Sequence, residues 1–380
     1  MRIFIDASRA LATNPTGIEI YCREIMSALL ALPESANHTW RLLTNRQPPS
    51  DYRLAKLPAH ATWQIIPGQR LWTLWHLSRY FRSQQSADDI LFVPGHVLPL
   101  ITPKKTVITI HDFAFRHFPE AYGAGERYWL NHELARSAKK ASAILVPSRS
   151  TAADLIDFYG MNPGKIHVIA HGVDHQRYRS LTIAQRKTLP KPITGAEPYF
   201  LVIGRVEYRK NSHRIIEAYQ QFRSLSKETT KLVFLGSPGY GWAEITAIHH
   251  HLPPAIQKDV LLLGYQSAEK TLTWLKAAQA LVYPSLYEGF GMPILEAQAA
   301  GVPVLTSQTS SLNEVAGQAA LIVDPTDTTA LAQGLHQLTT SQPLRTELSL
   351  KGLSNAAHFT WQKAAEQTLA VLLTVARGEK

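Results

Sequence analysis

The sequence predicts an α/β protein of two Rossmann-like domains that face each other across a cleft. Its 380 residues are too many for one ordinary hydrophobic core and suit two. Short apolar runs alternate with helical patterns along the chain, which is typical of parallel sheets covered on both faces. Residues 180–198 interrupt this rhythm with Pro, Gly and Lys and few large apolar side chains, so we interpret them as a linker.

The first domain is expected over residues 1–185 and begins with a strand, a loop and a helix. Residues 2–6 are a short apolar run, residues 14–17 (Asn-Pro-Thr-Gly) are typical of a loop, and apolar residues follow at helical spacing: Ile18, Tyr21, Ile25 and Leu29. This order is the opening of a Rossmann-like unit. Further apolar runs that end in turn residues lie at 90–93, 107–110, 143–146 and 166–169.

The second domain is expected over residues 186–360 and repeats the pattern. Strand-like apolar runs lie at 199–204, 231–236, 260–264, 280–284 and 302–306. A final helix is expected over residues 361–380, with Ala364, Leu369 and Leu372 on one face. Because ligands of doubly wound sheets bind beyond the carboxyl ends of the strands, the loops after these runs are predicted to carry the site.

The segment 288–296 (Glu-Gly-Phe-Gly-Met-Pro-Ile-Leu-Glu) carries the strongest functional signal. Its two glycines let the backbone approach a ligand, and its proline suits the first turn of a helix. Amides around Gly291 and Met292 at the start of that helix favour an anion such as phosphate. Glu296 lies about one turn further on and suits ribose hydroxyls, whereas Glu288 suits the hydroxyls of a sugar.

A cluster of cations and one amide follows the predicted strand 199–204, at Arg205, Arg209, Lys210 and Asn211. Such cations can neutralise a diphosphate and stabilise the charge that grows on a leaving group. Alone, the cluster would be interpreted as a solvated basic loop. The acidic motif in the same domain favours the functional interpretation.

As a set, these motifs resemble those of the family 4 retaining glycosyltransferases, which have the GT-B fold. The likeness rests on the Glu-x7-Glu spacing at Glu288 and Glu296, and on three further segments: Gly204-Arg205 with Lys210-Asn211, Thr109-Ile110-His111-Asp112, and His171-Gly172-Val173-Asp174. It covers nearly the whole chain, from Gly17 to the C-terminal helix. The resemblance also implies that residues 361–380 cross back to the N-terminal domain.

The resemblance implies roles for the donor-side residues. Arg205 and Lys210 would bind the donor diphosphate, Glu296 the ribose, and Glu288 hydroxyls of the transferred sugar. Backbone amides would hold the phosphate and hydroxyls, from Gly289, Phe290, Gly291 and Met292. Together with His111, the side chains of Arg205, Lys210 and Glu288 form the expected catalytic set.

On the N-terminal side, the resemblance implies that His111 lines the anomeric centre and that Gly17 leaves room for the diphosphate or the acceptor. The first loop has one glycine where many family members carry two. His96 and Asp112 are candidates for the acceptor side. Two interpretations stay open for each: His96 contacts the acceptor or is an ordinary loop residue, and Asp112 orients His111 or caps the next turn.

The expected activity is transfer of a hexose from a nucleotide sugar to a glycan or lipid-linked acceptor, with retention at the anomeric carbon. GDP-mannose is the favoured donor, with a UDP-hexose as the other candidate. No residue is an obvious covalent nucleophile, so same-face attack is the working hypothesis. No Asp-x-Asp ends a strand and the run His249 to His251 is interpreted as surface, so neither a metal nor another cofactor is expected.

Other functions remain as alternatives. A nucleotide-sugar epimerase of the same fold would act without an acceptor, and a non-catalytic sugar-nucleotide-binding protein would need no acidic and basic set. A nicotinamide dehydrogenase is disfavoured because no Gly-x-Gly-x-x-Gly follows the first strand. Nucleic-acid binding has only net charge in its favour.

The positive charge of the chain is unevenly distributed and is concentrated in the first half. Residues 1–190 hold 23 Lys+Arg and 14 Asp+Glu, whereas residues 191–380 hold 16 and 15. An anionic partner or plain solubility would explain this bias. Residues 69–82 combine Trp, Leu, Tyr and Phe with Arg70, Arg79 and Arg82, so they predict either a core helix with a charged outer face or a helix on an anionic membrane. The single cysteine and the short first apolar run suggest a cytoplasmic protein, with the inner face of the membrane as a further option.

Overall fold

The computed structural model describes residues 1–13, 15–50, 52–84, 89–182, 185, 197–226, 228 and 230–378. The chain divides into two compact units, Met1–Gly172 with Thr360–Lys380, and Val173–Phe359. Residues 173–182, which the sequence analysis placed in the first domain, therefore belong to the second unit. Most of the predicted linker lies outside the described residues.

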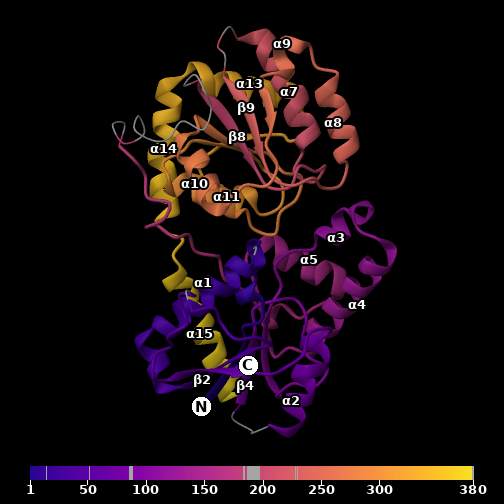
Figure 1. Cartoon of the computed structure of the whole chain (residues 1–380), viewed down its shortest axis with the longest axis vertical. Coiled ribbons are helices and arrows are strands. Elements are labelled where there is room, and N and C mark those ends of the chain that lie inside the picture. The colour runs from indigo at the N-terminus through magenta and orange to yellow at the C-terminus, as the bar shows by residue number, and fades with distance from the viewer. Residues whose placement is uncertain are drawn as a thin grey trace. The chain divides into compact units, whose positions relative to one another are not determined.

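The first unit is built on a parallel sheet with helices on its faces (Figure 1). Its strands are β1 (Arg2–Asp6), β2 (Thr39–Thr44), β3 (Ala61–Ile65), β4 (Asp89–Val93), β5 (Lys105–Thr109), β6 (Ala143–Val146) and β7 (Ile166–Val168). Its α-helices are α1 (Gly17–Ala31), α2 (Leu77–Ser83), α3 (Ala114–His117), α4 (Ala124–Lys140), α5 (Arg149–Tyr159) and α15 (Trp361–Arg377). Short helical turns lie at Arg9–Leu11, Pro33–Asn37, Trp72–His76, Pro119–Ala121 and Pro163–Lys165.

The strand order of the first sheet is β3-β2-β1-β4-β5-β6-β7, and all pairs are parallel. Strands β1, β4 and β6 are buried nearly throughout, which explains why they appear as continuous apolar runs rather than alternating ones. The order reverses between β1 and β4. A ligand of this sheet would therefore bind beyond the carboxyl ends of these two strands.

The second unit repeats the architecture with a smaller sheet. Its strands are β8 (Tyr199–Ile203), β9 (Lys231–Leu235), β10 (Val260–Leu262), β11 (Ala280–Tyr283), β12 (Val304–Ser307) and β13 (Leu321–Val323). Its helices are α7 (Ser212–Leu225), α8 (Trp242–His250), α9 (Pro254–Gln257), α10 (Ala268–Ala277), α11 (Met292–Ala299), α12 (Leu312–Ala316), α13 (Thr328–Thr340) and α14 (Gln342–Ala356). The order β10-β9-β8-β11-β12-β13 is again parallel and reverses between β8 and β11.

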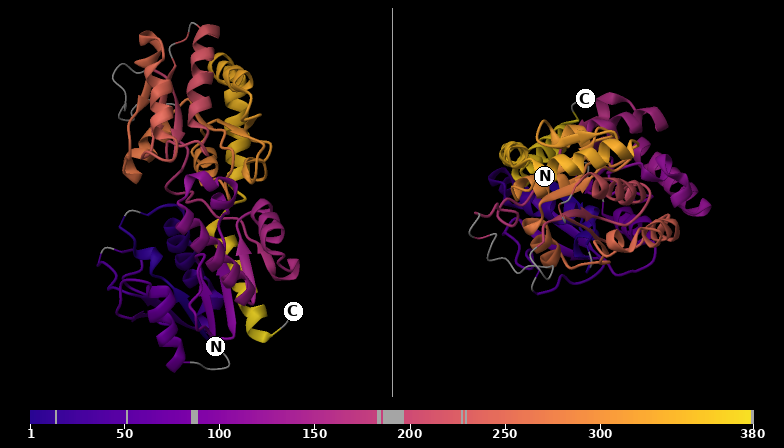
Figure 2. Two further views of the ribbon diagram at one scale, coloured as in Figure 1. Left: turned by 90° about the vertical axis from the view of Figure 1, so that its right-hand side faces the viewer. Right: turned by 90° about the horizontal axis from the view of Figure 1, so that it is seen from above.

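The C-terminal helix α15 packs in the first unit, beside α1 and against β4 and β5. Both views show the yellow helix among elements of the indigo to purple unit (Figures 1 and 2). Its buried face carries Trp361, Ala364, Ala365, Thr368, Leu369 and Leu372. Gly172 makes this return possible, because a Cβ at Gly172 would stand 2.2 Å from the backbone nitrogen of Trp361.

The predicted two-domain α/β fold is confirmed in its essentials, since the chain forms two parallel sheets covered by helices. No helix among the described residues is both long enough and apolar enough to cross a bilayer.

Candidate active site

Glu288 is the hub of the candidate site in the second unit. It lies in the loop after β11, only 8% exposed, and faces the loop after β8 across the point where the strand order reverses. Arg209 Nη1 donates to Glu288 Oε2 at 3.0 Å, and Lys210 Nζ donates to Oε1. The Tyr283 hydroxyl also donates to Oε1 at 3.0 Å.

The electrostatics of this hub keep Glu288 charged. Burial alone would raise its pKa, but the charges of Lys210 and Arg209 and the hydrogen bond from Lys210 outweigh burial and hold the pKa at about 2. Arg209 is held a second time by Glu207 Oε1 at 2.7 Å. The carboxylates therefore fix two cations at the end of β8, where an anionic ligand of the sheet would bind.

Two serines shape the loop that carries Glu288. The backbone N–H of Glu288 donates to Ser310 Oγ at 2.9 Å, and Ser311 Oγ donates to the carbonyls of Glu288 and Phe290 at 2.8 Å each. Ser310 adopts φ 47°, a left-handed conformation that brings its hydroxyl under the loop. The segment that follows β12 thus helps to hold the loop in place.

Helix α11 begins at this loop with an open N-terminus. Gly291 precedes it at φ 111°, a conformation that favours glycine, and Pro293 occupies its first turn. Among the described residues, no backbone carbonyl or side chain accepts from the N–H groups of Gly291 and Met292. Such amides at a helix N-terminus are suited to bind phosphate.

Glu296 lies on α11 in a different environment from Glu288. Burial raises its pKa, and a hydrogen bond from the Tyr178 hydroxyl to Oε1 at 2.8 Å and the charge of Arg177 partly counteract this. Arg205, the other cation expected to bind the diphosphate, has a side chain 67% exposed. Its guanidinium donates to the Pro238 carbonyl at 3.3 Å and lies 3.9 Å from Glu207.

His111 is the centre of the candidate site in the first unit. It follows β5 and is 6% exposed, and its Nε2 lies 3.2 Å from the carbonyl oxygen of Pro94. Because a carbonyl oxygen only accepts, we assign the proton to Nε2, which leaves Nδ1 as an acceptor. Burial, together with His96 and Arg9, lowers the pKa of His111 to about 3, so the ring is neutral.

Aromatic side chains from three other elements surround His111. Tyr21 of α1 packs edge-on at 4.7 Å between ring centroids, and His171, after β7, at 5.6 Å. Trp361 of α15 stacks on His171 at 6.0 Å. The returning C-terminal helix therefore packs on His171, which in turn contacts His111.

The other predicted residues of the first unit have distinct environments. The backbone N–H of His111 donates to His96 Nδ1 at 3.4 Å, and burial lowers the pKa of His96 to about 3. Asp112 caps the next turn, because its Oδ1 accepts from the Ala114 N–H at 3.0 Å. Of the two roles considered for Asp112, the structure shows the cap, while Pro94 orients His111. A Cβ at Gly17 would meet no atom within 4 Å, so this position faces open space.

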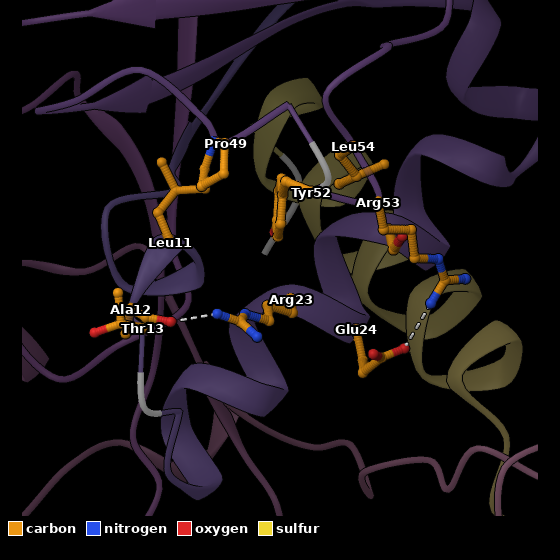
Figure 3. Close-up of a pocket in the computed structure, with 10 residues that line it drawn as sticks. Leu11, Ala12, Thr13, Arg23, Glu24, Pro49, Tyr52, Arg53 and Leu54 are labelled. Atoms are coloured by element: carbon orange, nitrogen blue, oxygen red, sulfur yellow. Dashed lines mark hydrogen bonds and ion pairs between the residues drawn. The ribbon is translucent and has the colours of Figure 1, made fainter. Parts of the chain in front are cut away.

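A pocket of about 420 Å³ lies beside α1 in the first unit (Figure 3). The Arg23 guanidinium carbon lies 5.9 Å from the centre of the Tyr52 ring, and Leu11 and Pro49 add apolar side chains to the lining (Figure 3). Arg53 closes one side through an ion pair with Glu24 at 3.1 Å. The pocket thus combines an aromatic face with charged and hydroxyl groups, and the sequence analysis did not find it.

The structure brings most of the predicted residues together in two groups, one in each unit. Lys210, Glu288 and the 289–292 backbone form one group, and His96 and His111 the other. Arg209 was expected only as one cation of the basic cluster and not in the catalytic set, whereas the structure places it on Glu288. Its position beside Lys210 in the same basic cluster was the signal. Among the described residues, no three His, Cys, Asp or Glu side chains are arranged to hold a metal.

Two doubly wound sheets, with cations and helix amides at the strand reversal of the second, define an enzyme that handles phosphorylated or nucleotide-linked substrates. Comparison with known proteins makes this specific. The family model Glycosyltransferase Family 4 matches residues 15–177, and Glycosyl transferases group 1 matches residues 185–354. O-antigen chain mannosyltransferase B of Escherichia coli is 30% identical over 283 residues, 74% of this chain and 73% of that protein. The chain therefore belongs to the family 4 glycosyltransferases, and it is a glycosyltransferase.

Other relatives carry the names of different glycosyltransferases. A glycogen synthase of Mycobacterium tuberculosis is 28% identical over 264 residues, 66% of this chain and 61% of the relative. A D-inositol 3-phosphate glycosyltransferase of Stackebrandtia nassauensis is 29% identical over 238 residues, 60% of this chain and 53% of the relative. In both cases the match spans less than two thirds of the relative's length.

Solved structures support the GT-B fold. Sucrose-phosphate synthase from Thermosynechococcus elongatus matches with a TM-score of 0.75 at 19% identity, over 100% of both chains. Anabaena HepE in complex with UDP and glucose matches with a TM-score of 0.71 at 16% identity, over 98% of this chain and 99% of that chain.

Proposed function

We propose that the protein is a retaining hexosyltransferase that uses a nucleoside diphosphate sugar, with GDP-mannose as the favoured donor. The observation that carries this proposal is the Arg209–Glu288–Lys210 hub next to the open N-terminus of α11. The choice of mannose rests on the similarity to the E. coli relative, which is an O-antigen chain mannosyltransferase. A UDP-hexose is the other donor considered.

In the proposed reaction, the second unit binds the donor and stabilises the leaving group. Arg205, Arg209 and Lys210 would neutralise the diphosphate, and the Gly291 and Met292 amides would bind its oxygens. Glu288 would hold the cations and accept from hydroxyls of the transferred sugar. Neutral His111, with Nδ1 as an acceptor, would line the anomeric centre. We propose that no metal takes part, so that EDTA should leave turnover unchanged and a loss restored by Mg²⁺ would contradict this.

A donor screen tests the proposal. The protein is incubated with GDP-mannose, UDP-glucose, UDP-galactose and ADP-glucose, with and without an oligosaccharide or polyprenyl-linked acceptor, and nucleoside diphosphate release is measured. We expect acceptor-dependent release from one donor, and NMR of the first product should show the anomeric configuration of the donor. Donor isomerisation without acceptor would instead identify an epimerase, and the opposite anomer would exclude retention.

We propose that the acceptor is a glycan or a lipid-linked glycan in polysaccharide or glycoconjugate synthesis, and that the pocket beside α1 binds one of its sugars. Sugars pack a ring face on aromatic side chains and bond their hydroxyls to charged groups, and the pocket offers Tyr52 and Arg23 for this. Tyr52→Ala should raise the KM for acceptor at an unchanged KM for donor. An equal rise for both substrates would argue against the assignment.

We also propose contact with an anionic membrane at the inner face of the cytoplasmic membrane, through residues 71–82. The core interpretation of this segment holds for one face, with Trp72, Leu77 and Phe81 at 5% exposure or less. The other face exposes Trp75 at 61% and Leu71 at 55%, next to Arg79 and Arg82. This combination suits an anionic lipid surface.

A vesicle assay tests the membrane contact. Wild-type protein should co-sediment with vesicles of phosphatidylglycerol and phosphatidylethanolamine, and Trp75→Ser with Arg79→Gln and Arg82→Gln should abolish this. Neutral phosphatidylcholine vesicles are the control. Equal co-sedimentation of the two proteins would reject the assignment.

A further inference from the structure

Tyr178 forms a hydrogen bond with Glu296, the carboxylate of α11 that is proposed to bind the ribose of a nucleotide. It lies outside every motif that defined the site, 118 residues before Glu296 in the sequence. Its hydroxyl donates to Glu296 Oε1 at 2.8 Å. Burial and the charge of Glu296 raise the pKa of Tyr178, so the phenol keeps its proton and acts as the donor.

The backbone around Tyr178 is fixed to the second unit on two sides. Arg177 Nη2 donates to Glu269 of α10 at 2.8 Å, and Lys276 of the same helix donates to the Arg177 carbonyl at 2.8 Å. The Val173 N–H donates to the Phe359 carbonyl at 3.1 Å. Asp174 closes a turn in between by accepting from the Arg177 N–H. The hydroxyl is therefore held in position by contacts independent of Glu296.

Glu296 and Glu288 differ in how many of their carboxylate oxygens accept hydrogen bonds from the protein. Lys210 and Tyr283 occupy Oε1 of Glu288, and Arg209 occupies Oε2. Among the described residues, Glu296 receives a hydrogen bond only from Tyr178, and only on Oε1. A carboxylate fixed through one oxygen keeps the other available for a ligand, and a bidentate acceptor suits the adjacent hydroxyls of ribose.

We infer that Tyr178 is a positioning residue of the ribose site, whose hydroxyl orients Glu296 so that Oε2 accepts from the ribose of a nucleoside diphosphate. This inference rests on the proposed function, since it takes the second unit as the nucleotide site. It makes Tyr178 a determinant of affinity for ribonucleotides over nucleotides that lack ribose hydroxyls. No chemical step is assigned to Tyr178.

Binding of paired nucleotides tests the inference. The full-length wild type and Tyr178→Phe are titrated by calorimetry with UDP, GDP and ADP, and with the 2′,3′-dideoxy form of whichever binds. We expect Tyr178→Phe to weaken binding of the ribonucleotide about three- to tenfold, the net effect of one ordinary hydrogen bond. Binding of the dideoxy form should be unchanged, because it makes no use of Glu296.

Tyr199→Phe is the matched control. It removes a hydrogen bond of the same kind in the same unit, from the Tyr199 hydroxyl to the Trp274 carbonyl at 2.6 Å. We expect it to lower thermal stability without changing nucleotide affinity. In a Glu296→Gln background, Tyr178→Phe should have little further effect, since the two residues act as a unit.

The pH dependence of binding gives a second readout. Glu296 accepts from ribose only as a carboxylate, and the Tyr178 hydrogen bond favours that form. In Tyr178→Phe the loss of affinity towards acid should therefore begin at a higher pH than in wild type. An equal loss for ribo- and dideoxynucleotide, or no loss for either, would overturn the inference while leaving the proposed function intact. Absence of any nucleotide binding to the wild type would overturn both.

Discussion

At the residue scale, two glutamates of one motif have opposite surroundings. Glu288 lies between Arg209 and Lys210, which hold its pKa at about 2, whereas burial raises the pKa of Glu296. Glu288 therefore stays ionised and fixes the two cations that are proposed to bind the diphosphate. Glu296 has one partner, Tyr178, and can accept from a ligand. Two residues of the same type are thus suited to different roles because their environments differ.

Replacing Glu288 by Gln should be costly for both stability and binding. Lys210, with a side chain 13% exposed, would then lose the carboxylate it is paired with, and Arg209, 19% exposed, would keep only Glu207. We expect a loss of about 3 kcal/mol in the free energy of unfolding, measured by urea denaturation, together with weakened donor binding. Glu347→Gln, which breaks an exposed pair with Lys351, should cost less than about 0.5 kcal/mol. Equal effects of the two changes would contradict the assigned role of Glu288.

His111 should remain neutral over the working pH range. Its pKa is lowered to about 3, so it takes up no proton between pH 8 and about pH 5. NMR of the imidazole carbons should show His111 shifts that do not change over this range. A midpoint near 6.5 for His111 would show that the ring is solvated rather than enclosed by Tyr21 and His171.

The sequence predicts those residues of the site that lie in loops directly after strands. Lys210, Glu288 and His111 were found because a turn after an apolar run marks the binding edge of a parallel sheet. Tyr178, Ser310 and Ser311 were not found, since each acts on a residue far along the chain and no local pattern reports such a contact. Arg209, and not Arg205, pairs with Glu288. This choice between two arginines depends on side-chain geometry within one loop, and residue type alone does not predict it.

At the element scale, α15 links the end of the chain to the first unit. Its apolar stripe packs beside α1, and its first residue, Trp361, stacks on His171 near His111. The helical spacing of Leu369 and Leu372 predicted the helix and its buried face. Its place in the first unit followed only from the family resemblance, because spacing within a helix does not identify its partner.

A core substitution in α15 should destabilise the first unit. Leu372 is 0% exposed, and Leu372→Ala leaves a cavity that costs about 3 kcal/mol, which corresponds to a Tm lowered by about 5–10 °C. Leu350→Ala on α14, where Leu350 is 64% exposed, is the control and should change Tm by less than about 1 °C. Equal Tm values for Leu372→Ala and wild type would show that α15 does not pack in the core.

At the scale of the whole molecule, three histidines with strongly lowered pKa values, His96, His111 and His171, make stability depend on pH. His96 and His111 have pKa values of about 3, and the pKa of His171 is also far below its ordinary value. The unfolded chain binds protons on these rings below pH 6.5 whereas the folded chain does not. Stability should therefore be full above pH 6.5 and fall as the pH decreases towards 3.

The expected slope is up to about 1.4 kcal/mol per pH unit for each ring between pH 6 and pH 5. Urea denaturation at these two values measures it. His96→Asn should reduce the slope by up to about 1.4 kcal/mol per pH unit, the contribution of one proton. A slope for His96→Asn equal to that of wild type would show that His96 is protonated in the folded protein.

The central claim is that the reversal point of the second sheet binds the diphosphate of a nucleotide. Calorimetric titration of the protein with UDP, GDP and ADP, repeated with Lys210→Met, tests it most directly. We predict that at least one of the three binds with a Kd in the micromolar range, about −8 kcal/mol, and that Lys210→Met weakens this binding at least about tenfold. Binding that is undetectable for all three nucleotides, or unaffected by Lys210→Met, would contradict the account.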